Sequence, residues 1–246
     1  ITVGERCNLN TTECFTEVKP KIPVNMSHFK SLLGQYRDLD EPFSKSDPIL
    51  HPVQHRIEVT GAPTWERPRP RHGEKLEAAR TEFLSMEKEG FVERGESPYA
   101  SPLHVVTKTD ESLRPCGDYR RLNKNTVPDR YPMPRIRDLT GKFLGCNVFS
   151  KIDLRKGFYQ IPMAEQDVSK TAITTPFGLF LFKRMPFGLR NASQTFQRLV
   201  DMLLQNLPFA VGYIDDIMIG SPDVSTHFCH LETLFKRLRE FGLRLK

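Results

Sequence analysis

Apolar residues recur at helical spacing in four parts of the 246-residue chain. Residues three or four positions apart share one face of a helix, so this spacing predicts helices over residues 29–39, 74–89, 191–206 and 226–241. Gly90 and Gly242 follow two of these segments and can end them as C-caps. Asn191 opens the third, and its side chain can cap the first turn.

Shorter apolar and β-branched runs predict strands over residues 103–106, 113–116, 148–152 and 177–182, with a further strand starting at Leu243. Two more apolar runs, 209–214 and 217–219, are separated only by Asp215 and Asp216, which predicts a hairpin with two carboxylates at its tip. Strands and helices do not alternate regularly as in a doubly wound sheet. The pattern therefore predicts an α+β fold in which helices back an antiparallel sheet on one side.

The first 72 residues are rich in proline and lack long periodic patterns. Each proline disfavours the helical region for the residue before it, so the segment is expected to be extended. We interpret residues 1–72 as a leader or linker and residues 73–246 as the folded domain. Ile1 is not followed by a basic and then apolar leader, and no apolar run reaches the roughly 18 residues of a membrane span. We therefore expect neither a secretory signal nor a membrane partner.

The cysteine and histidine pattern does not predict a metal or disulfide framework. Five cysteines occur without a CxxC pair, which argues against both a set of disulfides and a zinc ribbon. We expect reduced thiols in an intracellular and most simply cytoplasmic protein. Two histidine groups are more typical of core and surface positions than of ligands: His51 with His55, and His227 with Cys229 and His230.

Positive charge is concentrated in one segment. The formal net charge is +6, and residues 114–137 alone carry seven basic against two acidic residues. Such a local basic surface favours a polyanionic partner, of which nucleic acid is the most common. A solvated face that keeps the protein soluble explains the same charge, and the sequence alone leaves both readings open.

Three aspartates are the strongest candidates for chemistry. Asp215 and Asp216 interrupt two strands apolar enough to be buried, and they lack the glycine that a tight turn favours. Like charges held together repel unless a proton or a cation offsets them, although a turn also tolerates Asp for ordinary reasons. Asp153 ends another predicted strand. Carboxylates from both places could hold two Mg²⁺ ions of the kind that assist phosphoryl transfer.

Several segments resemble, in order along the chain, the reverse transcriptases of gypsy-type LTR retrotransposons and, more distantly, of retroviruses. They are Ser97-Pro-Tyr-Ala-Ser-Pro, Leu113-Arg-Pro-Cys-Gly-Asp-Tyr-Arg-Arg-Leu-Asn, Phe149-Ser-Lys-Ile-Asp-Leu, Gly157-Phe-Tyr-Gln-Ile-Pro-Met, Met185-Pro-Phe-Gly-Leu-Arg-Asn-Ala, Thr195-Phe-Gln-Arg and Tyr213-Ile-Asp-Asp. The resemblance covers residues 74–246, and the preceding residues resemble the link between protease and polymerase in such polyproteins. It implies the palm and fingers of a right-hand polymerase, with the chain ending before the thumb.

The resemblance also implies an activity and its partners. The chain would add deoxynucleoside triphosphates (dNTPs) to a primer 3′-hydroxyl on an RNA or DNA template. Asp153, Asp215 and Asp216 would be the catalytic metal ligands for two Mg²⁺ ions, or Mn²⁺ in their place. The number of protomers in the assembly stays open.

The resemblance assigns five residues to the incoming nucleotide. Lys108 and Arg114 would clamp its triphosphate, for which an ammonium and a guanidinium are suited. Phe158 would lie against the sugar and exclude a 2′-hydroxyl, while Phe187 and Gly188 would line the pocket. Without the resemblance, the two basic residues are exposed hairpin charges and Phe158 is a core residue.

Departures from the family pattern do not touch the three aspartates. Retroviral enzymes usually have Gln where Phe187 stands, and relatives often have Lys at Thr107, Gly at Glu111 and Ser at Lys156. Two other functions remain as alternatives. The chain is a decayed or domesticated element product that binds nucleic acid without polymerising, or it is a structural interaction module.

Overall fold

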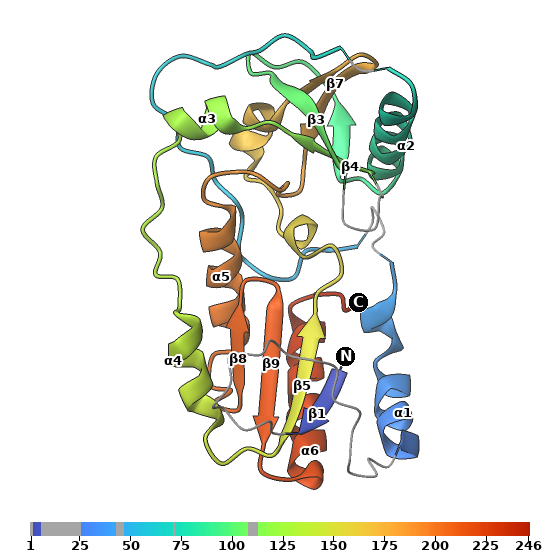
Figure 1. Ribbon diagram of the computed structural model, residues 1–246, viewed down its shortest axis with the longest axis vertical. Helices are drawn as coiled ribbons and strands as arrows, with labels where there is room; N and C mark the ends of the chain where they lie inside the picture. The colour runs from blue at the N-terminus through green and yellow to red at the C-terminus, as the bar shows by residue number, and fades with distance from the viewer. Residues whose placement is uncertain (1, 6–25, 43–46, 71, 108–112) are drawn as a thin grey trace.

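The strands of this computed structural model form two separate sheets, one at each end of an elongated molecule (Figure 1). The structure describes residues 2–5, 26–42, 47–70, 72–107 and 113–246. One sheet has four antiparallel strands in the order β1-β5-β9-β8. These strands are β1 (Thr2–Glu5), β5 (Val148–Asp153), β8 (Ala210–Tyr213) and β9 (Asp216–Ser221).

The second sheet has five strands in the order β2-β7-β6-β3-β4. They are β2 (Val92–Arg94), β3 (Ser101–Thr107), β4 (Leu113–Gly117), β6 (Ile173–Thr175) and β7 (Gly178–Phe182). The pair β3 and β6 is parallel, and the other pairs are antiparallel. The expected α+β class is therefore confirmed, while the single antiparallel sheet is corrected to two sheets, one of them mixed.

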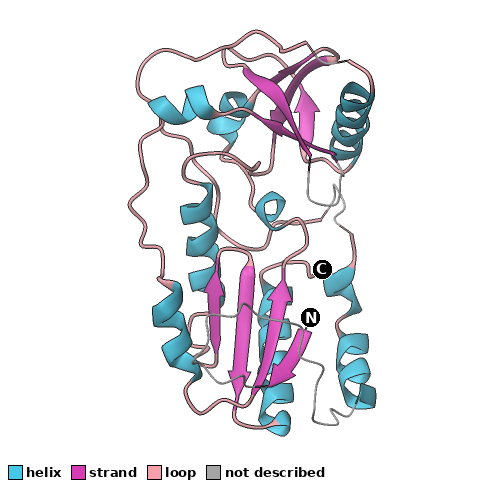
Figure 2. Cartoon of the chain, in the orientation of Figure 1, coloured by secondary structure: helices cyan, strands magenta, loops and turns pink. Residues whose placement is uncertain are grey.

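Helices flank both sheets (Figure 2). They are α1 (Met26–Gln35), α2 (Glu74–Lys88), α3 (Arg120–Asn125), α4 (Ile136–Thr140), α5 (Ala192–Leu203) and α6 (Val224–Glu240), with 3-10 turns at Arg37–Asp40, Gly141–Phe143, Gly157–Gln160 and Glu165–Thr171. Asp223 caps α6 by accepting the Thr226 amide. Helix α6 lies behind the four-stranded sheet, where it packs on β5 and β9, while α5 packs on β8 and α2 packs on β2 and β4. No helix among the described residues is long and apolar enough to cross a membrane.

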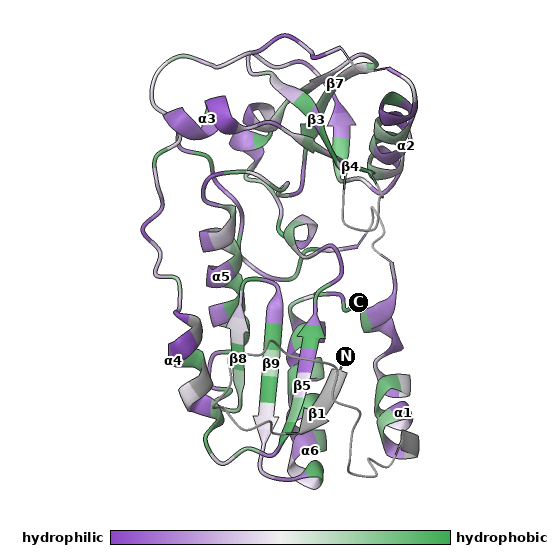
Figure 3. Cartoon of the chain, viewed as in Figure 1, coloured by the Kyte–Doolittle hydropathy of each residue, from purple (hydrophilic) through white to green (hydrophobic). Residues whose placement is uncertain are grey.

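The core of the four-stranded sheet follows from alternation along its strands. In β5, Val148, Ser150 and Ile152 are buried, and Ser150 contacts His227 of α6. The residues between them therefore lie on the other face of the sheet. Apolar residues concentrate on these strands and on the helices behind them (Figure 3). Gly212 allows α5 to approach β8, because a Cβ there would collide with Val200.

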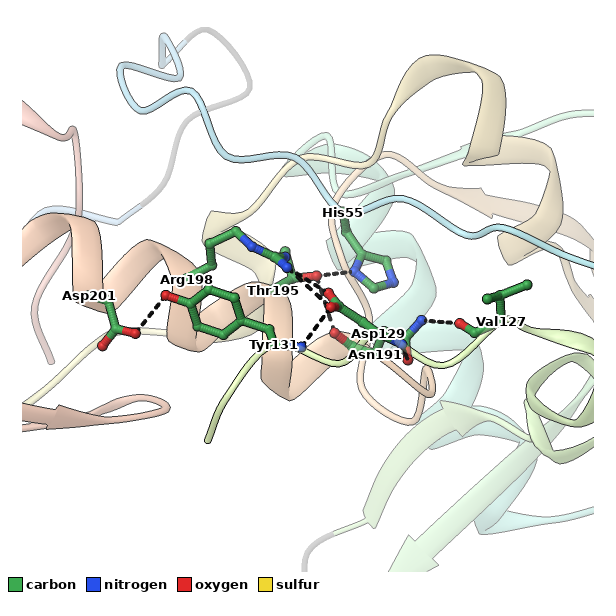
Figure 4. Close-up of polar contacts among 8 residues, drawn as sticks. All are labelled: His55, Val127, Asp129, Tyr131, Asn191, Thr195, Arg198 and Asp201. Carbon is green, nitrogen blue, oxygen red and sulfur yellow. Dashed lines mark hydrogen bonds and ion pairs between the residues drawn. The ribbon is translucent and has the colours of Figure 1, made fainter. Parts of the chain in front are cut away.

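Two expectations near chain turns were wrong. Asn191 stands at the N-cap of α5 but makes no capping bond. Its side chain instead accepts the Asp129 amide at 3.0 Å and donates to the Val127 carbonyl at 2.7 Å (Figure 4). Those backbone groups lie outside any helix or sheet and need hydrogen-bond partners, which the side-chain amide of Asn191 supplies. The strand expected from Leu243 is a single bridge between Leu245 and Leu154.

Part of the presumed leader packs on the domain. Strand β1 pairs with β5, and His51, Val53, His55 and Ile57 are buried. His51 hydrogen bonds with the Gln160 carbonyl and His55 with the Thr195 hydroxyl. The division at residue 72 remains a prediction, since contacts on both sides of it do not define a domain boundary.

Two buried histidines, His55 and His227, should lower the free energy of unfolding when the pH falls to mildly acidic values. Burial lowers the pKa of His55 and of His227 from 6.5 to about 4. Between these values the unfolded chain binds more protons, so stability is full above pH 6.5 and falls as the pH drops toward 4. Each histidine should cost about 2 kcal/mol between pH 7.5 and pH 5.

Urea unfolding at the two pH values measures this loss. The pH dependence should shrink in His55→Gln and should be unchanged in His104→Gln, a control at an exposed position of β3. Equal pH dependence in both variants would contradict the assignment to His55.

Candidate active site

Strand register brings Asp153 and Asp216 together. In the antiparallel pair of β5 and β9, Asp153 lies directly opposite Asp216. Both side chains are about half exposed, at 47% and 49%. They lie on the face of the four-stranded sheet turned away from α6, here called the carboxylate face. Two carboxylates in direct cross-strand positions repel one another, and a nearby cation would offset this repulsion.

Asp215 lies in the turn that precedes Asp216. Since Tyr213 pairs with Asp216, the hairpin loop consists of Ile214 and Asp215. The expected tip with both aspartates is thus corrected: Asp216 is already the first residue of β9. The backbone at Gly157 approaches this turn, and a Cβ there would lie 3.2 Å from that of Asp215.

The turn is strained and is held by a buried glutamine. Ile214 has a positive φ of 54°, a conformation that costs a β-branched residue about 1–3 kcal/mol. Gln197 of α5 is fully buried and accepts the Ile214 amide at 2.9 Å. Its amide group also donates to the Gly212 carbonyl at 3.1 Å and to Asp201 at 2.9 Å. Gln197 therefore holds the β8 side of the turn, at Gly212 and Ile214, immediately before Asp215.

A lysine already supplies positive charge to the acidic pair. The Lys151 ammonium lies 3.0 Å from Asp216 Oδ1 and 3.5 Å from Asp153 Oδ1. The contact with Asp216 is the main cause that raises the pKa of Lys151. Position 151 precedes Asp153 by two residues on one strand, so both side chains lie on the same face.

The donor chemistry suits a hard divalent cation. Carboxylate oxygens are the ligands that Mg²⁺ prefers, usually one or two of them with water and phosphate oxygens. Asp153 and Asp216 supply such a pair, and an ammonium stands between them as a stand-in cation. Among the described residues, no three acidic, histidine or cysteine side chains form a ready-made metal group. The expected convergence of all three aspartates on one metal site thus stays a prediction.

An aromatic cluster lies beside Gly157, the residue whose backbone approaches the Asp215 turn. Phe158 follows Asp153 by five residues, and its ring contacts Phe187 at 4.8 Å and Phe196 at 5.3 Å between centroids. The Arg114 guanidinium lies 5.1 Å from the centre of the Phe187 ring. Three of the residues expected at the nucleotide therefore lie side by side. Lys108 is outside the described residues.

Gly188 lies in the turn before α5, next to Phe187. Its φ of +90° is a conformation that glycine adopts without strain. Its carbonyl accepts the Asn123 amide of α3 at 2.7 Å. The turn with Phe187 and Gly188 is thereby fixed to the five-stranded end of the molecule.

Sequence reasoning missed Lys151 and Gln197. Lys151 stands two residues before Asp153, and this spacing is the signal that both side chains lie on one strand face. Gln197 is a polar residue beside Phe196 on the otherwise apolar side of α5, which is a signal for a buried hydrogen-bonding role.

Comparisons with known proteins agree on one family. Residues 106–246 match the family model described as "Reverse transcriptase (RNA-dependent DNA polymerase)". Among curated proteins, the chain is 35% identical over 225 residues to the retrovirus-related Pol polyprotein from transposon 297 of Drosophila melanogaster, covering 88% of this chain and 21% of the relative. It is 36% identical over 195 residues to that from transposon gypsy of the same organism, covering 76% and 19%. The chain thus spans about a fifth of the length of these relatives.

Solved structures share the fold. The prototype foamy virus protease-reverse transcriptase (CSH mutant) superposes with a TM-score of 0.82 at 22% identity, covering 92% of this chain and 31% of that one. A foamy viral protease-reverse transcriptase in complex with double-stranded DNA gives 0.80 at 24% identity, covering 96% and 45%. The palm-and-fingers fold implied by the sequence is therefore confirmed.

The buried glutamine predicts a sizeable stability effect. Gln197→Ala leaves the Ile214 amide and the Gly212 carbonyl without their partner, which should cost about 2–3 kcal/mol. Chemical denaturation measures the loss. Gln205→Ala is the control, because Gln205 is exposed beyond the end of the same helix, and it should change stability by less than about 0.5 kcal/mol. Equal effects of the two changes would show that Gln197 does not support the turn.

Proposed function

The chain belongs to the reverse transcriptase (RNA-dependent DNA polymerase) family, and we propose that it carries the nucleotide-adding centre of an RNA-directed DNA polymerase. The observation that supports this most is the pair Asp153 and Asp216, opposite one another on the carboxylate face, with Asp215 in the adjoining turn. In the reaction, the primer 3′-hydroxyl attacks the α-phosphate of a dNTP. A phosphodiester bond forms and pyrophosphate leaves.

Asp153, Asp215 and Asp216 would hold two Mg²⁺ ions, or Mn²⁺ in their place. Bound metal would stabilise charge on the attacking and leaving oxygens. The role of the chain is to hold these acids on rigid elements. Register fixes Asp153 against Asp216, and Gln197 fixes the turn with Asp215.

The aromatic cluster would receive the nucleotide. The Phe158 ring contacts the Phe187 ring at 4.8 Å between centroids, and Phe158 follows Gly157, whose backbone approaches the Asp215 turn. Both contacts support a role for Phe158 at the sugar. Arg114 extends over Phe187 and would bind the triphosphate, together with Lys108. Gly188 would line the same pocket, where its φ of +90° allows the chain to turn beside Phe187.

The basic segment would bind the nucleic acid backbone. Residues 114–137 run from β4 through α3 to α4 along one side of the molecule, past both sheets (Figure 1). Arg198, which pairs with Asp129, and Tyr131, which donates to Asp201, tie this connection to α5 (Figure 4). Basic side chains on this connection would bind phosphates regardless of base sequence. Similar foamy viral enzymes were solved with double-stranded DNA and with an RNA/DNA hybrid.

The alternative is a chain that binds nucleic acid without polymerising. All three aspartates are present, which favours the enzyme. Primer extension on an RNA template with dNTPs and Mg²⁺ distinguishes the two. Extension that needs metal supports the polymerase, and binding without any extension supports the alternative.

Removing one acid should abolish extension. Asp215→Asn retains the size of the side chain but removes its charge, and the rate should fall by more than about 100-fold, beyond the usual effect of losing an outer partner of a metal ligand. Asp138→Asn makes the same charge change at an exposed position of α4 and should extend primers normally. Full extension by Asp215→Asn would exclude this residue from the catalytic centre.

The aromatic ring at position 158 should govern sugar choice. Phe158→Ala opens space for a 2′-hydroxyl, so the ratio of ribonucleotide to deoxynucleotide incorporation should rise by at least about tenfold, corresponding to relief of a steric clash. Single-nucleotide extension with dNTP and NTP pairs measures the ratio. Phe149→Ala, on β5 against Phe143, removes an equal volume away from the cluster and should leave the ratio unchanged. An unchanged ratio in Phe158→Ala would overturn its assignment.

A further inference from the structure

Lys151 places its ammonium beside the two carboxylates proposed above as metal ligands. Its ammonium contacts the Oδ1 atoms of both Asp216 and Asp153, at 3.0 and 3.5 Å. A divalent ion held by both carboxylates would lie close to this ammonium. The chain therefore carries its own cation for the acidic pair.

The Lys151 side chain can move away from the two carboxylates. Its side chain is 48% exposed, and its two partners are exposed to a similar degree. Ion pairs at such positions are screened by water and contribute little to folding. The four-carbon stem of lysine is flexible, so the ammonium can turn into solvent without disturbing the β5–β9 pairing.

The Lys151 ammonium and a divalent cation would repel one another if both lay against Asp153 and Asp216. A metal ion binds carboxylate oxygen at about 2.1 Å, which would bring it within about 5 Å of the present ammonium position. At that separation the two positive charges repel even in water. Binding of the metal therefore requires the ammonium to move away, and its attraction to Asp216 and Asp153 opposes this movement.

We propose that Lys151 is a built-in counter-ion that competes with divalent metal for Asp153 and Asp216, and so sets the metal affinity of the site. The proposal rests on the proposed function in that these acids are metal ligands. Without metal, Lys151 offsets the repulsion between the acids. Because Lys151 competes for the acids, the site binds metal weakly until the nucleotide triphosphate contributes further oxygen ligands and negative charge. Metal and nucleotide binding are then coupled.

Direct Mn²⁺ binding tests the proposal independently of catalysis. Electron paramagnetic resonance reports the free Mn²⁺ remaining during titration of the whole chain. Lys151→Met should lower the apparent Kd about three- to tenfold, the size expected for removing one screened charge at this distance. Lys151→Gln, a polar replacement, should do the same, while Lys151→Arg should stay near the unaltered chain.

Lys183→Met is the matched control. Lys183 has a similar exposure of 51% and pairs with Glu93 in the five-stranded sheet. This change should leave Mn²⁺ affinity within about twofold, since the ion pair of Lys183 is with Glu93 and not with either aspartate, and exposed charges are screened by salt. An equal gain in this variant would mean that net charge alone is responsible, which overturns the proposal.

The remaining outcomes separate this proposal from the proposed function. Equal or weaker Mn²⁺ binding by both Lys151→Met and Lys151→Gln overturns the competition. The gain must also vanish when Asp153→Asn is combined with Lys151→Met, and its persistence would place the Mn²⁺ elsewhere. Primer extension by the unaltered chain is scored separately, so a polymerase without the gain refutes only the role of Lys151. A gain without any extension refutes only the polymerase.

Discussion

The alignment of β5 with β9 is the constraint on which the candidate site depends. Asp153 faces Asp216 only in this register. A slip of one residue would turn every side chain of a strand to the other face, carrying the carboxylate into the layer covered by α6. The buried side of the pair prevents this, because Ile152, Ile217 and Ile219 are fully buried there. The apolar face thus fixes the position of the charged face.

The same pairing determines where strain is stored. The two-residue loop must return the chain within Ile214 and Asp215, and this forces Ile214 into a conformation that suits glycine. Gln197 supplies the partner that the turn lacks, from a helix that can approach because Gly212 has no side chain. The packing of α5 on β8 therefore both holds the turn with Asp215 in place and stabilises the strained Ile214.

The sequence predicted the elements that carry strong periodicity and missed those whose formation depends on distant partners. Helices α5 and α6 and strands β5, β8 and β9 fall within a few residues of their predicted bounds, since each buries one apolar face. Strands β2 and β6 have three residues each and exist because β7 pairs with both. Their own residues carry no comparable pattern. The parallel pairing of β3 with β6 likewise joins segments far apart in the chain.

The acids of the site could be named from the sequence, but their surroundings could not. Asp153, Asp215 and Asp216 stand out because they interrupt apolar strands. Lys151 contacts two of them because of where the assembled strands place its side chain. Asn191 binds the backbone of residues 127 and 129 instead of capping its own helix for the same kind of reason. Local sequence offers several partners for such side chains, and only the assembled fold selects among them.

The claim that a metal binds at this register is tested most directly by iron-dependent backbone cleavage. Fe²⁺ takes carboxylate ligands, and with ascorbate and peroxide it produces radicals that cut the chain beside the ion. If a metal binds between β5 and β9, two cuts are expected, one near Asp153 and one near Asp215, both suppressed by excess Mg²⁺ and by Asp153→Asn. Cuts confined to other parts of the chain, or cuts at these positions that persist in Asp153→Asn, would contradict it.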